Sequence, residues 1–118
     1  MQYILLIYGN EAEAKSASKE DGLRMMGEYK VFTDDLKAAG KMQGGAPLES
    51  VTTATTVRVK AGKTLRTDGP FAETREQLGG FYMIDAKDLD EAVMIAAKVP
   101  GAKYGSIEVR PVMQIPGM

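Results

Sequence analysis

The chain has 118 residues, which suits a single domain, and its 44% hydrophobic and 26% charged residues are typical of a soluble globular protein. It contains neither cysteine nor histidine, which excludes disulfides, thiolate nucleophiles and the most common general base and metal ligand. The formal net charge of -1 leaves no electrostatic footprint for nucleic acid or an anionic membrane. We therefore expect a cytoplasmic protein that binds no nucleic acid, membrane, metal or cofactor.

The first half of the chain predicts a strand followed by a helix. Residues 3–8 form an unbroken apolar run, too short to span a membrane and typical of a central strand covered on both faces. Residues 9–21 are polar and predict a loop with a short helical turn. A helix then follows, because apolar residues recur at spacings of three and four: Met25, Tyr29, Phe32, Leu36 and Ala39. Gly40 is a typical helix stop.

The middle of the chain predicts strands and a hairpin. Residues 41–50 contain two glycines and a proline, so a strand there is short, bulged or at an edge. Residues 53–60 alternate between apolar and polar side chains, 61–63 form a turn, and 64–67 return as a second strand. Residues 80–85 predict another strand that is apolar on both faces.

The last third predicts a helix and a final strand. Asp88 is a candidate N-cap, and Glu91 stands three residues later, as in a capping box. The buried stripe of this helix comprises Leu89, Ala92, Val93, Ala96 and Val99. Pro100 and Gly101 end it, and residues 106–112 alternate as a strand.

This order of elements is the β-α-β-β-α-β pattern of ferredoxin-like α+β folds with one extra hairpin. Right-handed crossovers would place both helices on one face of an antiparallel sheet. The strands at 3–8 and 80–85 are apolar on both faces, so the second face would stay exposed in a monomer. We therefore expect a homodimer in which the two open faces pack together.

The stretch 67–82 combines a tight turn, charged side chains and the start of an apolar strand. Asp68 precedes Gly69 and Pro70, which together form a stiff turn. Asp68 is the candidate catalytic acid or base, since a cleft walled by aromatic rings would raise the pKa of a carboxyl group. The alternative is that Asp68 accepts hydrogen bonds within its own turn.

Four further residues are candidate ligand contacts. Arg75 and Glu76, with Glu73, are candidates for a polar pocket in which Arg75 grips a substrate carboxylate. The alternative for this cluster is a solvated loop or a salt bridge between subunits. Tyr29 and Tyr82 are candidates to stack on a ligand or bond to it, and their alternative is a place in the core with each hydroxyl paired at the rim.

Long motifs in this chain resemble the DGPF proteins of the wider YciI-like, or YCII-related, group. These motifs are residues 32–40, 55–58, 67–74, 79–82, 86–92 and 105–112. The resemblance implies a single domain over residues 1–118 and a dimeric α+β barrel of two ferredoxin-like chains. The group includes a chloromuconolactone dehalogenase and members proposed to use an Asp–His pair in a cleft. Near the position of that histidine this chain has Tyr29. Some DGPF genes lie beside sigma-factor genes.

The sequence thus predicts a small homodimer that holds a small organic ligand in a cleft near Asp68. Its side chains would support proton transfer on a carbonyl- or lactone-like compound. The alternatives are a non-catalytic binding or regulatory protein, linked to a sigma factor, and a purely structural dimer.

Overall fold

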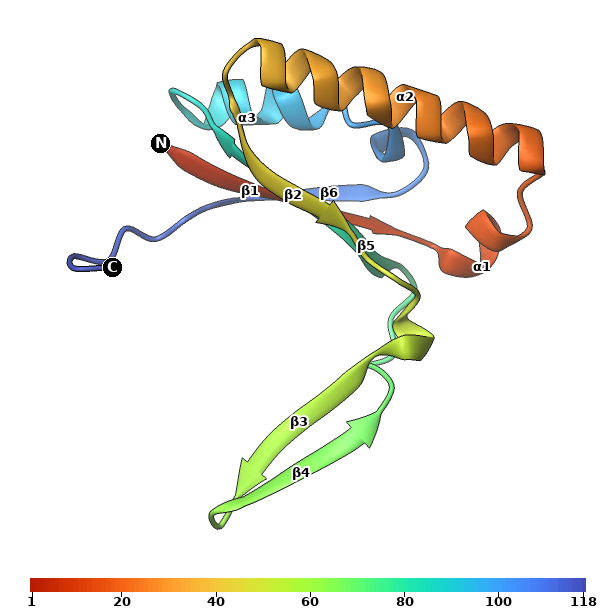
Figure 1. Cartoon of the computed structure of the whole chain (residues 1–118), viewed down its shortest axis with the longest axis vertical. Coiled ribbons are helices and arrows are strands. Elements are labelled where there is room, and N and C mark those ends of the chain that lie inside the picture. The colour runs from red at the N-terminus through yellow and green to blue at the C-terminus, as the bar shows by residue number, and fades with distance from the viewer.

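The computed structural model describes all 118 residues and consists of a four-stranded antiparallel sheet with helices on one face (Figure 1). The sheet order is β2-β5-β1-β6. Its strands are β1 (Gln2–Gly9), β2 (Met42–Pro47), β5 (Gln77–Asp85) and β6 (Ser106–Pro111). The two longer helices are α2 (Lys19–Ala38) and α3 (Leu89–Ala96). This arrangement confirms the ferredoxin-like α+β fold.

Local capping fixes the ends of the helices. The Ser18 hydroxyl accepts the Asp21 amide at 3.0 Å at the start of α2. At its end Gly40 adopts a φ of 70°, and the amides of Gly40 and Lys41 bond to the carbonyls of Lys37 and Leu36, a Schellman motif. The predicted stop at Gly40 is therefore confirmed.

The other helical segments are short. Where the sequence predicted a loop with a helical turn, α1 (Glu11–Lys15) forms, capped by Asn10. Asp88 caps α3 through the Glu91 amide at 2.9 Å, as predicted, but the Glu91 carboxylate bonds to the Lys87 amide rather than back to Asp88. Single 3₁₀ turns are η1 (Val51–Thr53) and η2 (Pro100–Lys103). None of the helices combines the length and apolarity that a membrane crossing requires.

The hydrophobic core lies between the helices and one face of the sheet. Its buried residues are Tyr3, Leu5, Phe32, Leu36, Ile84, Ala86, Ala92, Ala96 and Val99. Side chains alternate along a strand, so the neighbours of Tyr3, Leu5 and Ile84 point to the opposite face. That face carries a partly buried apolar patch made of Ile4, Leu6, Phe81 and Met83, which we call the open face. No element of the chain covers it (Figure 1).

The remaining strands, β3 (Thr55–Lys60) and β4 (Lys63–Asp68), pair only with each other. Ala61 and Gly62 turn the chain between them with φ of 50° and 76°, as a two-residue hairpin turn with positive φ requires. This hairpin projects away from the helices (Figure 1). The strand β2 lies at a sheet edge and has a register shift between Met42 and Gly44, which confirms the predicted bulged edge strand.

Candidate functional site

A pocket of about 750 Å³ lies between the first half of α2 and the sheet. Met25, Tyr29 and Thr33 line it from α2, and Ile7 and Tyr82 line it from the central strands. Glycines of β2, β5 and η2 complete the wall: Gly45, Gly79, Gly80 and Gly101. Its volume is in the range of pockets that hold small organic ligands.

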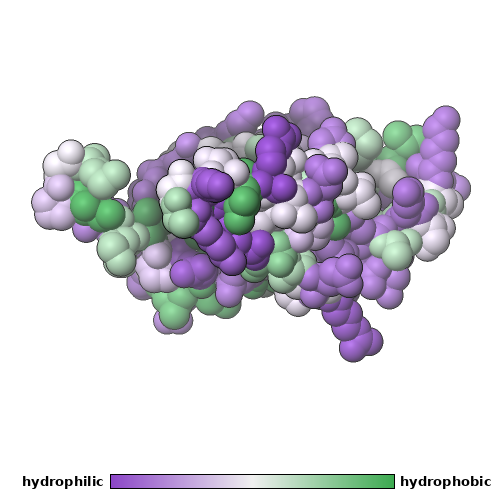
Figure 2. Space-filling view, turned by 90° about the horizontal axis from the view of Figure 1, so that it is seen from below, coloured by the Kyte–Doolittle hydropathy of each residue, from purple (hydrophilic) through white to green (hydrophobic).

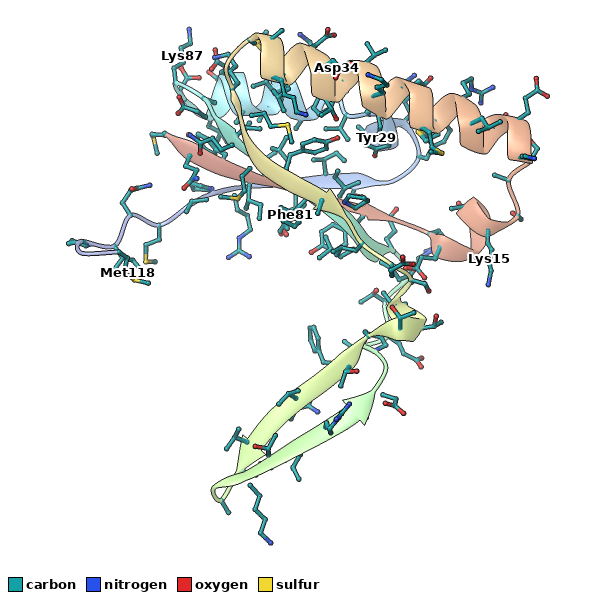
Figure 3. All side chains as sticks on the ribbon, in the orientation of Figure 1. Lys15, Tyr29, Asp34, Phe81, Lys87 and Met118 are labelled. Carbon is teal, nitrogen blue, oxygen red and sulfur yellow. The ribbon has the colours of Figure 1, made fainter.

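Tyr29 lines this pocket from α2 and brings a phenolic hydroxyl to it. The side chain lies under α2, on the side that faces the sheet (Figure 3). Its hydroxyl oxygen accepts the Gly101 amide at 3.2 Å, and no group of the chain accepts its proton. Burial raises the pKa of Tyr29, the bond from Gly101 opposes this shift, and the nearby Tyr82 adds to it. Tyr29 therefore remains a neutral hydroxyl whose proton is free for a ligand oxygen.

Tyr82 supplies a second hydroxyl, held in a fixed position. It shares a 2.8 Å hydrogen bond with Thr33, and its ring packs edge-on against Phe32 at 5.1 Å between centroids. Gly45 lies opposite Tyr82 in the sheet, and a β-carbon there would lie 2.7 Å from the Phe81 carbonyl oxygen. The wall of the pocket is thus backbone at this point, with Tyr82 exposed to a ligand beside it.

The rim of the pocket is charged. Glu11, Glu13, Asp21 and Arg24 come from α1 and the start of α2. The Glu11 carboxylate accepts the Ser50 hydroxyl at 2.8 Å and the Val51 amide at 3.1 Å. Asp21 pairs with Arg24 at 3.1 Å. The arrangement is an apolar interior with two hydroxyls and a charged mouth, which can orient a small oxygen-bearing molecule.

The structure brings together two of the five residues predicted for the site. Tyr29 and Tyr82 line the pocket. Arg75 is exposed, and Glu76 accepts the Ser106 hydroxyl at 2.8 Å; neither lines the pocket. Asp68 is exposed at the end of β4 and makes no side-chain hydrogen bond within the chain. The roles of Asp68, Arg75 and Glu76 stay predictions.

The sequence patterns did not predict the charged rim of the pocket or the place of Thr33 in its wall. The polar segment 9–21 could have indicated the rim, because it directly follows a central strand. Such a segment emerges at the end of the sheet, beside the first turns of the next helix. No three acidic side chains cluster closely enough to hold a metal ion.

Comparison with known proteins agrees with this fold. The sequence profile of the family described as "YCII-related domain" matches residues 1–116. An uncharacterized protein of Rhizobium meliloti (strain 1021) is 43% identical over 113 residues, 94% of this chain and 91% of the relative. A solved structure of 5-chloro-2-hydroxyhydroquinone dehydrochlorinase (TftG) from Burkholderia phenoliruptrix, in complex with 2,5-dihydroxybenzoquinone, superposes with a TM-score of 0.54 at 16% identity, covering 96% of this chain and 94% of that one. The fold, the matched profile and the identity over nearly the whole length together show that the chain belongs to the YCII-related family.

Proposed function

We propose that the protein binds a small organic molecule in the pocket between α2 and the sheet, through a carbonyl, phenolic or carboxylate oxygen. The observation that carries the proposal is the Tyr29 hydroxyl, which is fixed by the Gly101 amide and keeps a proton that no group of the chain accepts. The hydroxyl lines the pocket with its donor unused by the chain, so an oxygen of a ligand can accept its proton.

The surroundings of Tyr29 favour a flat, mostly apolar ligand. The rings of Tyr29 and Tyr82 and the side chains of Ile7 and Met25 provide apolar area, and glycines allow close approach to the backbone. The Tyr82 hydroxyl, already bonded to Thr33, offers a second contact at a fixed distance from the first. Two fixed polar groups in an apolar wall provide orientation as well as affinity.

If the protein is an enzyme, its chemistry would be proton transfer on a carbonyl- or lactone-like compound. The neutral Tyr29 would stabilise charge that develops on the ligand oxygen. Asp68 remains the candidate acid or base, and since it lies outside the pocket of its own chain, a second chain would have to bring it there. TftG has a similar fold, and its name describes a reaction on an oxygenated ring. Oxygenated ring compounds are therefore suitable candidates for the first substrate tests.

A non-catalytic binding or regulatory protein is the second candidate. It is favoured because two rim carboxylates are already engaged: Glu11 by Ser50 and Val51, and Asp21 by Arg24. Engaged carboxylates suit recognition at the mouth better than proton abstraction. Turnover of a bound lactone or quinone would separate the two candidates.

Calorimetric titration with 2,5-dihydroxybenzoquinone and a panel of related phenols and lactones tests the proposal. Tyr29→Phe removes only the hydroxyl and should weaken binding by roughly tenfold or more, as the loss of one buried hydrogen bond does. Tyr3→Phe is the matched control, because the Tyr3 hydroxyl contacts only the Met1 sulfur, at 3.8 Å, and lies outside the pocket. Equal affinity in wild type and Tyr29→Phe would contradict the proposal.

A further inference from the structure

The hairpin of residues 55–68, here called the arm, stands away from the rest of the chain. It projects beyond the side of the sheet that carries the open face (Figure 1). The radius of gyration is 16.4 Å, against about 13.5 Å for a compact domain of this length. The arm therefore extends beyond the compact part of the fold.

The arm does not bury its own apolar side chains. All residues of β3 and β4 are exposed except Thr56, which is partly buried and donates to the Gly69 carbonyl at 2.9 Å. Val57 and Val59, on one face of the ribbon, are 60% and 68% exposed. Seen from the side on which the arm projects, hydrophobic patches lie among hydrophilic side chains (Figure 2). An isolated two-stranded hairpin is marginally stable in water, so another surface is needed to hold the arm in place.

The charges of the arm are opposite to those of the rest of the chain. The arm carries Arg58, Lys60, Lys63 and Arg66 against a single acid, Asp68, which gives it a net charge of +3. The other residues carry 11 basic and 15 acidic side chains, a net charge of -4. None of the four cations has an ion-pair partner within the chain. A surface like the body of this same chain would supply the missing acidic partners.

We infer that each arm packs against the body of a second copy of the chain, which covers the face of the ribbon that carries Val57, Val59 and Arg66. Arg58, Lys60 and Lys63 lie on the other face and reach acidic side chains of the partner around the edge of the ribbon. This inference rests on the homodimer expected from the open face. The arm extends to the side of the sheet on which a second copy would cover the open face (Figure 1). A two-fold arrangement would then place each arm along its partner. Nucleic acid would meet the cations but leave the two valines in water and face an acidic body.

Zero-length carbodiimide coupling in the full chain tests the inference. A mixture of ¹⁴N- and ¹⁵N-labelled protein is refolded together, coupled and digested, and the cross-linked peptides are read by mass spectrometry. We expect mixed-isotope pairs that join Lys60 or Lys63 to an Asp or Glu outside residues 55–68. A dimer of confirmed mass that gives no such pairs would overturn the arm contact and leave the dimer standing, whereas a monomer would overturn both.

A matched pair of variants gives an independent measurement. Val57→Asp and Val31→Asp both place a charge at an exposed valine, 60% and 61% exposed, but Val31 belongs to α2, on the opposite side of the sheet from the open face. Sedimentation should show a dissociation constant raised by about tenfold or more for Val57→Asp only. Equal effects of the two variants would overturn the inference. A second outcome would also overturn it: duplex DNA blocks the carbodiimide coupling of Lys60 and Lys63, and the dimer without DNA does not. The arm would then bind nucleic acid rather than a second copy of the chain.

Discussion

The Gly101 amide donates to the Tyr29 hydroxyl at 3.2 Å across 72 residues of sequence. A β-carbon on residue 101 would lie 2.6 Å from that same oxygen. The bond therefore requires glycine at this position for space, and it ties η2 to α2 at the wall of the pocket.

Replacing Gly101 with alanine should displace the Tyr29 ring and break this bond. We expect the free energy of unfolding to fall by about 1–2 kcal/mol and ligand affinity to fall with it. Gly27→Ala is the control, because a β-carbon there meets nothing within 4 Å and Gly27 lies inside a helix. That control should gain about 0.5–1 kcal/mol. Urea unfolding and calorimetry measure both effects, and unchanged ligand affinity in Gly101→Ala would contradict the site.

Ionisation of Tyr29 should occur above the usual pH for tyrosine. Burial raises the pKa of Tyr29 in the folded chain, so its contribution to stability is complete below pH 10 and is lost as the pH rises through the raised pKa. Ligand binding should be lost over the same interval, because the phenolate has no proton to donate. Ultraviolet difference spectra should show a late tyrosine step that is missing from Tyr29→Phe; an identical titration of the two proteins would refute the assignment.

Glu91 joins α3 to the end of α2. The Lys41 ammonium group lies 2.9 Å from its carboxylate, and this bond, with the Lys87 amide, holds the pKa of Glu91 below its ordinary value. The stabilisation is present above the ordinary pKa of glutamate and is lost as the pH falls through the lowered one. Glu91→Gln should therefore lower Tm at neutral pH, and the difference from wild type should fade in acid. Glu49→Gln, an exposed residue without a side-chain bond, should show no such pH dependence.

The open face should be the dimer interface. Light scattering at micromolar concentration should give twice the chain mass of 12.7 kDa. Met83→Asp would leave an unpaired charge inside the interface and should cost several kcal/mol of association free energy. Met26→Asp, at a methionine that is 70% exposed on α2, should leave the mass unchanged. A wild-type chain that stays monomeric would refute the interface.

Measuring both Tm and turnover in Asp68→Asn tests the role of Asp68. Asp68 is exposed and makes no side-chain hydrogen bond within the chain, so Asp68→Asn should leave Tm nearly unchanged. If Asp68 transfers a proton in the dimer, the same variant should abolish turnover, because an amide has no ionisable proton. Intact turnover and ligand affinity in Asp68→Asn would reduce Asp68 to a turn residue.

The sequence by itself determined the strands, the two longer helices and their order. The helix that ends at Gly40 and the cap at Asp88 were predictable because capping acts between residues one turn apart. The hairpin and the bulged edge strand were predictable from alternation and from turn residues. The ferredoxin-like arrangement followed, since few topologies connect such an order of elements.

Only the tertiary structure revealed the pocket of the single chain. The sequence placed the cleft at the conspicuous turn around Asp68, whereas the pocket of the single chain lies where α2 crosses the sheet. Its key contacts, Tyr29 with Gly101 and Thr33 with Tyr82, join residues 72 and 49 positions apart. Local patterns report on neighbours within a turn or a strand pair, and they do not reveal which distant backbone will approach a side chain. The direction in which the hairpin leaves the sheet depends in the same way on packing, and it carries Asp68 away from the pocket.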